Sequence, residues 1–108
     1  MAGLHKLDDE DYPAYTTGQA AELLDVQQAF LRSLDSAGAV SPHRSAGGHR
    51  RYTRRQLTIA GRLRALFDEG YSLTASQRIL ALEDELAQAR DEISFLRARL
   101  GLEGAAEA

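Results

Sequence analysis

Residues 41–53 read Ser41-Pro-His-Arg-Ser-Ala-Gly-Gly-His-Arg-Arg-Tyr-Thr53 and carry the strongest local signal in the chain. They combine a turn-forming Ser-Pro pair, a tip that contains Gly47 and Gly48, and a basic run rich in arginine. Because glycine takes positive φ without a steric clash, a tight chain reversal at this tip costs little conformational free energy. The pattern predicts a small two-stranded wing whose arginines hold a phosphate backbone. The alternative is a solvated, arginine-rich loop.

The charge distribution favours the phosphate-binding interpretation, although the chain as a whole is acidic. The net charge is −3, but the window from residue 26 to residue 67 contains only one acidic residue, Asp35. A local basic field of this kind governs which partners approach, because distant charges are screened by salt. A basic face on an acidic chain is typical of nucleic-acid binding. The arginines of the window are Arg32, Arg44, Arg50, Arg51, Arg54, Arg55, Arg62 and Arg64.

Length and composition limit the other possibilities. A chain of 108 residues predicts one domain with an appended element, and a core of about 60 residues is marginal enough to benefit from dimerisation. The absence of cysteine excludes disulfides, thiolate metal sites and thiol redox sensing. We expect no metal, no cofactor, no membrane segment and no small-molecule effector. The expected location is the cytoplasm, in association with the nucleoid.

Four segments are predicted along the chain. Residues 1–14 form a disordered acidic N-terminal segment, for which the alternative is an acidic flap that competes with DNA for the basic face. Residues 15–70 form the DNA-binding domain, residues 71–100 form a helical dimerisation element, and residues 101–108 form a flexible tail.

Two short helices are expected before the wing, at 15–24 and 27–37. Thr16 and Thr17 are cap candidates for the first helix, and Gly38 ends the second. Two helices of this length joined by a tight turn favour a helix-turn-helix, whose second helix enters the major groove. The alternative is a plain αα-hairpin. The first helix is expected to bury Ala20, Ala21, Leu23 and Leu24, and the second Phe30, Leu31 and Leu34. The second helix presents Gln27, Gln28 and Arg32 to bases or phosphates.

A third helix is predicted from Arg54 to Glu69, with Thr53 as its N-cap and Gly70 as its stop signal. Its buried stripe would contain Leu57, Ala60, Leu63, Leu66 and Phe67. Arg54 and Arg55 stand at the helix start, where they oppose the helix dipole, which is easier to understand if an anion lies nearby.

The last helix spans 73–100 and carries a heptad pattern from residue 79 onward. We expect it to mediate self-association; the alternative is a surface helix folded back on its own domain. Glu85 with Arg90 of a second copy, and Glu92 with Arg97 of that copy, would match in a parallel pair. The predicted dimerisation residues are Ile79, Leu82, Leu86, Ala89, Ile93, Leu96 and Leu100.

Taken together, these features resemble the MerR family of bacterial transcription regulators. The most specific parts are Gly38-Ala39-Val40-Ser41-Pro42-x-Arg44 and Gly47-Gly48-His49-Arg50-Arg51-Tyr52, and the opening Tyr15-x-x-Gly18-Gln19-Ala20-Ala21-x-Leu23 is also similar. The chain resembles in particular the short actinobacterial members of the HspR and BldC types. The resemblance implies a mainly α fold: a winged helix-turn-helix with a two-stranded wing and a long C-terminal dimerisation helix.

The resemblance also implies the site and the assembly. Family dimers usually pair their long helices antiparallel, whereas the charge pattern favours a parallel pair; both arrangements stay open, with the antiparallel one preferred from the resemblance. Two departures concern the second helix: Asp25 stands where glycine is common, and Gln27-Gln28 replaces the usual cap. Tyr52 is counted with the wing, although a core position beneath it is the favoured interpretation. The candidate DNA-binding residues are Thr17, Gln19, Gln27, Gln28, Arg32, Arg44, His49, Arg50, Arg51, Tyr52, Arg54 and Arg55.

The function expected from this set is sequence-specific, dimeric DNA binding by a transcriptional regulator without an effector domain, acting as a repressor or as a developmental or stress regulator. A protein co-regulator is conceivable. The alternatives are an architectural DNA-bending excision factor and an adaptor that binds a protein through the C-terminal coil. An enzyme is not expected, because the sequence contains no catalytic constellation.

Overall fold

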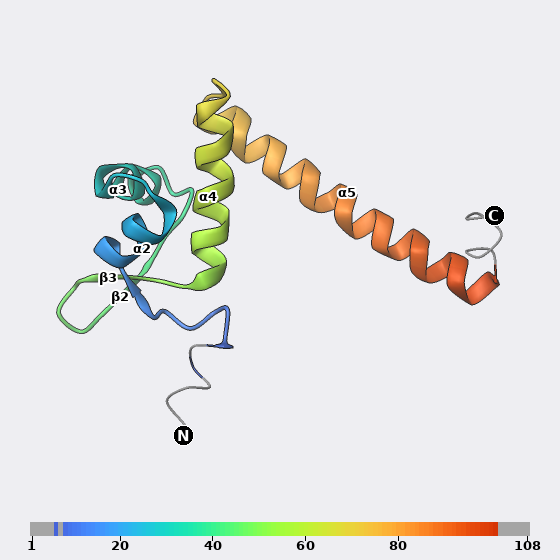
Figure 1. The fold of residues 1–108 in the computed structure, drawn as a ribbon, viewed down its shortest axis with the longest axis horizontal. Helices are drawn as coiled ribbons and strands as arrows, with labels where there is room; N and C mark the ends of the chain where they lie inside the picture. Colours follow the sequence, from blue (N-terminus) through green and yellow to red (C-terminus); the bar gives the residue numbers. More distant parts are fainter. Residues whose placement is uncertain (1–5, 7, 102–108) are drawn as a thin grey trace. The chain divides into compact units, whose positions relative to one another are not determined.

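The computed structural model describes residue 6 and residues 8–101, and the chain divides into two compact units, Met1–Tyr71 and Ser72–Ala108 (Figure 1). The described residues of the first unit form three helices and a small sheet, and those of the second form one long helix. This mainly helical architecture confirms the predicted fold class. The predicted tail at 101–108 lies outside the described residues apart from Gly101, the C-cap of the long helix.

Helix α2, Thr17–Leu24, begins at a complete capping box. Thr16 Oγ1 accepts a hydrogen bond from the Gln19 backbone N–H at 3.1 Å, and the Gln19 side chain accepts one from the Thr16 N–H at 2.9 Å. The helix ends at Asp25, which has left-handed backbone angles, φ 53° and ψ 51°. Asp25 is the only non-glycine residue with positive φ in the described part of the chain.

Replacing Asp25 with glycine should stabilise the first unit. A side chain in the left-handed region is strained, and a carboxylate at a helix C-terminus opposes the dipole. We expect Asp25→Gly to raise the free energy of unfolding by about 0.5–1 kcal/mol in urea titrations. Asp25→Asn removes the charge but keeps the Cβ, so it should recover only part of this gain. A glycine variant that is less stable than the parent would contradict the argument.

Helix α3, Gln28–Ser36, follows the turn and packs on α2. Its N-cap, Gln27, makes no side-chain capping bond, so the helix start lacks the fixation that Thr16 provides for α2. Gly38 follows the C-cap Ala37 with φ 73°, as the sequence predicted for the residue that ends the helix.

The sheet has one more strand than predicted. Strands β2, His43–Arg44, and β3, Arg50–Tyr52, form the expected antiparallel wing. Its turn has Gly48 at φ 82°, whereas Gly47 is not among the residues with positive φ. Strand β1, Tyr15–Thr16, pairs antiparallel with the other edge of β3, with Tyr15 opposite Tyr52. The prediction that Tyr15 belongs to the first helix is wrong, whereas Thr16, predicted as a cap candidate, is the N-cap of α2.

Helix α4, Arg54–Asp68, follows β3 directly and begins at a second capping box, formed by Thr53 and Gln56.

The core of the first unit differs from the prediction at one residue of α2. The prediction that Leu23 points inward is wrong, because Leu23 is 64% exposed. Phe30 and Phe67 are half-buried and meet edge to face, with ring centroids 5.5 Å apart. The core of the first unit is formed by Ala20, Ala21, Leu31, Leu34, Val40, Tyr52, Leu57, Ala60 and Leu63.

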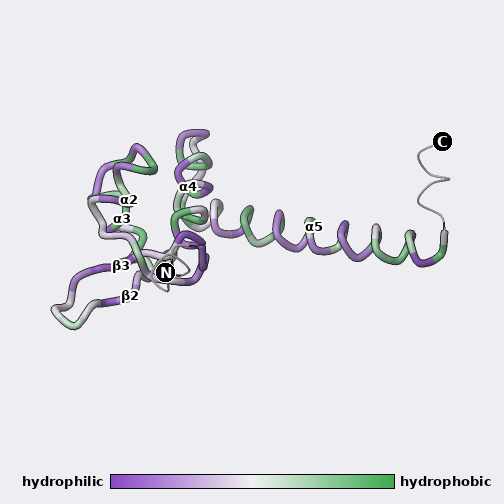
Figure 2. Tube along the Cα trace, turned by 60° about the horizontal axis from the view of Figure 1, so that its bottom comes forward, coloured by the Kyte–Doolittle hydropathy of each residue, from purple (hydrophilic) through white to green (hydrophobic). Residues whose placement is uncertain are grey.

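The second unit consists of helix α5, Leu73–Leu100, whose 28 residues begin at the N-cap Ser72. The Ser72 side chain accepts a hydrogen bond from the Ala75 N–H at 3.1 Å. Hydrophobic and hydrophilic residues alternate along the helix (Figure 2). Within residues 6 and 8–101, no helix is both long and apolar enough to cross a membrane.

Candidate nucleic-acid interface

A polar cleft of about 490 Å³ lies between the start of α2 and the wing. Backbone N–H groups at a helix start carry partial positive charge, and the wing adds guanidinium groups, so the cleft suits an anion such as a phosphate. Thr17 was predicted for this interface from the sequence, whereas its neighbours Thr16 and Gly18 were not. The lining residues are Thr16, Thr17, Gly18, Arg44, Gly48, His49, Arg50 and Arg51.

Helix α3 presents the candidate base-reading residues on its exposed face. Gln27, Gln28 and Arg32 are all exposed, and Arg32 Nη1 lies 3.5 Å from Gln28 Oε1. The described residues provide Arg32 with no carboxylate partner, so its guanidinium is available to a ligand. An exposed helix face with a free arginine and two amides matches the donor and acceptor pattern of base edges in a major groove.

Two wing arginines are held by a carboxylate from α3. Asp35 Oδ2 accepts a hydrogen bond from Arg50 Nε at 2.8 Å and one from Arg44 Nη2 at 3.2 Å. The Asp35 side chain is only 18% exposed, which strengthens the pairing. Arg44 also donates to the Gly48 carbonyl across the wing turn at 3.2 Å. Asp35 therefore ties the wing to the end of the helix-turn-helix, a role that was not predicted from the sequence.

Asp35→Asn should destabilise the fold of the first unit. Losing two charge-assisted bonds in a partly buried site should lower the free energy of unfolding by about 1–2 kcal/mol. Urea denaturation would measure this effect. The matched control is Asp68→Asn, which breaks an exposed ion pair with Arg64 and should change stability by less than about 0.5 kcal/mol.

Two candidates have roles inside the fold. The Tyr52 side chain is fully buried, and burial raises the pKa of its phenol above the usual value. Tyr52 is therefore a core residue beneath the wing, which is the position favoured from the sequence, and we assign it no contact with DNA. Gln19 is exposed, but its side-chain oxygen accepts the Thr16 N–H in the α2 capping box.

Two further candidates lie on the wing. His49 is exposed, and Arg51 is half-buried with its Nη1 3.4 Å from the Arg50 carbonyl.

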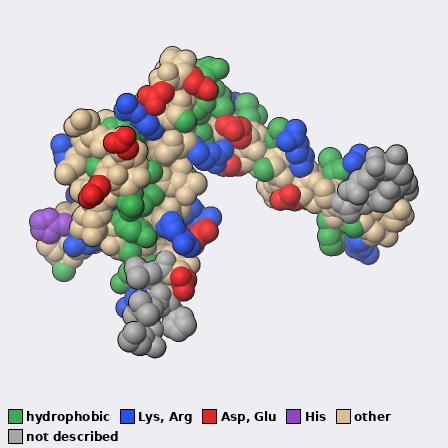
Figure 3. Space-filling view, viewed as in Figure 1, with side chains coloured by type: hydrophobic (Ala, Val, Ile, Leu, Met, Phe, Trp, Pro, Cys, Tyr) green, Lys and Arg blue, Asp and Glu red, His purple; other side chains and the backbone are tan. Residues whose placement is uncertain are grey.

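Arg54 and Arg55, at the start of α4, contact the N-terminal segment. Arg55 Nε lies 2.7 Å from Asp11 Oδ1, and Arg55 Nη2 lies 3.1 Å from Glu10 Oε2. Arg54 Nη2 donates to the Asp8 carbonyl at 2.9 Å. Figure 3 shows acidic and basic side chains side by side here. The segment predicted to be disordered is thus held against α4 in its described part, whereas residues 1–5 and 7 lie outside the described residues.

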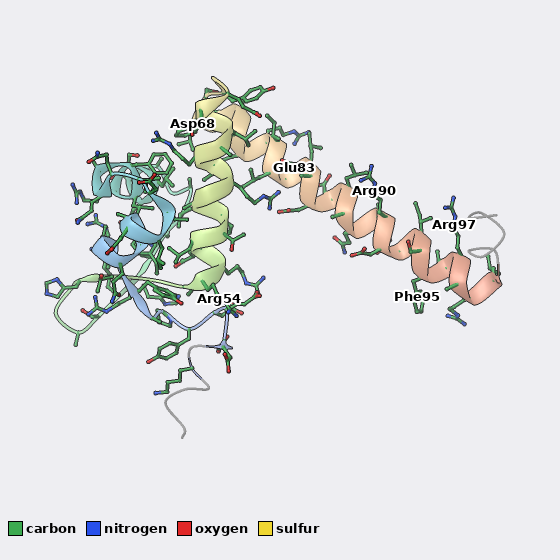
Figure 4. The ribbon with its side chains drawn as sticks, viewed as in Figure 1. Arg54, Asp68, Glu83, Arg90, Phe95 and Arg97 are labelled. Carbon is green, nitrogen blue, oxygen red and sulfur yellow. The ribbon has the colours of Figure 1, made fainter. Side chains whose placement is uncertain are left out.

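The predicted dimerisation stripe lies on α5. Ile79 is half-buried, whereas the six later members of the stripe are exposed. Leu86 is 50% exposed and Ile93 47% exposed. Arg90 and Arg97 project from one side of the helix and Phe95 from the opposite side (Figure 4).

Within residues 6 and 8–101, no group of three or more histidine, aspartate or glutamate side chains is arranged to hold a metal ion.

Comparisons with known proteins agree with this geometry. The model of the MerR HTH family of regulatory proteins matches residues 15–83. The putative heat shock protein HspR of Streptomyces coelicolor is 38% identical over 92% of this chain, and the HTH-type transcriptional repressor CarH of Myxococcus xanthus is 32% identical over 68%. This chain spans less than two thirds of either relative, 65% of HspR and 26% of CarH.

Two solved structures share the fold. A MerR family transcriptional regulator from Bacillus cereus has a TM-score of 0.58 at 24% identity, over 85% of this chain and 73% of that one. HiNmlR, a MerR family regulator lacking the sensor domain and bound to promoter DNA, has a TM-score of 0.56 at 25% identity, over 81% and 78%. The family model covers the helix-turn-helix, the wing and the first part of α5. The chain therefore belongs to the MerR helix-turn-helix family of regulatory proteins.

Proposed function

We propose that this chain is a sequence-specific DNA-binding transcriptional regulator that acts as a dimer. The observation that carries the proposal is the polar cleft between the start of α2 and the wing, beside the exposed face of α3. A phosphate in this cleft would position the duplex, and α3 would then lie in the adjacent major groove. HiNmlR, a structural neighbour, was solved on promoter DNA, which supports this use of the shared fold.

The division of labour follows from the environment of each side chain. Arg32, Gln27 and Gln28 would contact bases, because they are exposed on α3. The remaining candidates would contact phosphates and so contribute to affinity for any sequence. These residues are Thr17, Arg44, His49, Arg50, Arg51, Arg54 and Arg55.

Dimerisation through α5 would present two such units to one operator. The apolar stripe on α5 is exposed within the described chain, and its a and d spacing suits a second copy of the same helix. We further propose that the chain acts as a repressor in the cytoplasm. CarH, named a transcriptional repressor, supports the sign of regulation. A promoter–reporter assay with and without the protein would test that sign.

The deciding experiment is selection of genomic fragments by the purified protein at physiological salt, followed by sequencing. We expect a short motif in inverted repeat, because a symmetric dimer presents two equal half-sites. Binding to the selected fragment should fall steeply with salt, because several arginines replace phosphate counterions. Direct repeats with phased bending would favour the architectural alternative. If no motif emerges and binding vanishes above low salt, the proposal is overturned.

A further inference from the structure

The sheet register explains why the N-terminal segment meets α4. Strand β1 pairs antiparallel with β3, with Tyr15 opposite Tyr52. Residues before Tyr15 must therefore run alongside residues after Tyr52, and these are Thr53 and the first turn of α4. The pairing delivers residues 8–11, here named the acidic segment, to Arg54 and Arg55. In Figure 4, Arg54 lies at the start of α4, beside the N-terminal segment.

The acidic segment is itself shaped by local hydrogen bonds. The Asp9 side chain accepts a bond from the Asp11 N–H at 2.8 Å, and the Tyr12 N–H donates to the Asp9 carbonyl at 3.2 Å. The Arg55 N–H, in the first turn of α4, donates to the Glu10 carbonyl at 3.0 Å. The turn thus presents the Glu10 and Asp11 carboxylates to the guanidinium of Arg55.

These carboxylates occupy a place suited to a phosphate. A helix start with two arginines in its first turn attracts an anion, and carboxylate oxygens resemble phosphate oxygens as acceptors for a guanidinium fork. The hydrogen bond to Asp11 raises the pKa of Arg55, and the same bond lowers the pKa of Asp11 below its usual value, as expected for a formed pair. The chain itself therefore supplies the anion expected at this helix start.

The contact is exposed enough to be exchanged. The Arg55, Glu10 and Asp11 side chains are 57%, 55% and 67% exposed, and ion pairs at this level of exposure are weak. A polyanion that offers many phosphates at once can displace them, whereas an isolated anion competes poorly. An intramolecular contact of this strength would therefore oppose DNA binding without preventing it.

We propose that the acidic segment is an intramolecular competitor of DNA, which holds Arg54 and Arg55 until a phosphate backbone displaces Glu10 and Asp11. This inference rests on the proposed function, because it assigns a regulatory contact to the same interface. It differs from a merely structural role in its sign, since loss of the competitor strengthens DNA binding.

The test uses the full chain and a 20-base-pair duplex of unrelated sequence, with affinity measured by fluorescence anisotropy at fixed salt. Glu10→Gln with Asp11→Asn should tighten binding by about three- to tenfold. The matched control is Asp8→Asn with Asp9→Asn, which removes the same charge from the same segment. Among the described residues, the Arg54 side chain meets Asp8 through the backbone carbonyl, and the Asp9→Asn substitution keeps a side-chain oxygen that can accept the Asp11 N–H. This control should change affinity by less than about twofold.

A third comparison isolates the contact. In an Arg55→Gln background, the Glu10 and Asp11 substitutions should have no further effect on affinity, because their main partner is absent. Equal effects of the two double variants would mean that only net charge matters, and the inference would be overturned. Weaker DNA binding and a lower melting temperature in the Glu10→Gln, Asp11→Asn variant would show that the segment only stabilises the fold, and would also overturn the inference. If neither the parent nor the variants bind DNA, the proposed function fails as well, which distinguishes the two failures.

Discussion

Arg32→Ala is expected to weaken binding to the selected target by about 10- to 100-fold, and binding to unrelated DNA by only a few-fold. Arg32 lies on the exposed face of α3, and the described residues give it no carboxylate partner. The substitution should leave the fold intact, because the neighbouring core residues Leu31 and Leu34 are unchanged. Titration of both duplexes at the same salt concentration measures the ratio directly.

Arg54→Ala is the informative counterpart. It also removes one arginine, but from the start of α4, where a phosphate contact would be independent of sequence. Target and unrelated DNA should therefore lose affinity by the same factor. If Arg32→Ala binds the target as well as the parent protein does, α3 is not the helix that contacts bases.

Helix positions were predictable because their signals are local. Thr53 and Ser72 cap α4 and α5, and Gly38 and Gly70 follow helix ends with positive φ, all within a few residues of the pattern that indicates them. Strand β1 was missed because its two residues form a strand only through pairing with β3, far along the chain. No period-two pattern can be recognised in two residues, so their helical neighbours dominated the prediction.

The candidate interface was predictable in composition but not in pairing. The run of arginines identified the basic face, and Arg44, Arg50, Arg51 and His49 do meet at one cleft. Which arginines are paired depends on tertiary approach, because Asp35 reaches Arg50 across 15 residues of sequence. Sequence charge alone would count every arginine as free. The single acidic residue in the basic window was the available signal for that contact.

Ile93→Lys should convert the proposed dimer into a monomer at micromolar concentration. Counted in sevens from Ile79 as heptad position a, Ile93 is also at position a, so each copy of the variant would place an unpaired ammonium in the apolar seam. Burying unpaired charge costs about 3 kcal/mol or more, which corresponds to at least about a hundredfold weaker association. Analytical ultracentrifugation over a concentration series measures the shift. The matched control is Phe95→Lys, which also replaces an exposed apolar residue but lies off the stripe.

If Phe95→Lys dissociates the dimer while Ile93→Lys does not, the interface lies on a different face of α5.

The relative orientation of the two α5 helices can be tested by disulfide cross-linking, because the chain contains no native cysteine. In a parallel pair, Leu100→Cys would place two thiols close enough to form a disulfide. In an antiparallel pair, the retained expectation, residue 100 of one copy lies near residue 79 of the other. The two thiols are then about 30 Å apart, at a rise of about 1.5 Å per residue. Absence of a disulfide in the Leu100→Cys dimer under mild oxidation therefore supports antiparallel pairing. Rapid formation of the disulfide would show a parallel pair. The Glu85–Arg90 and Glu92–Arg97 ion pairs, rather than the antiparallel arrangement usual in the family, would then set the orientation.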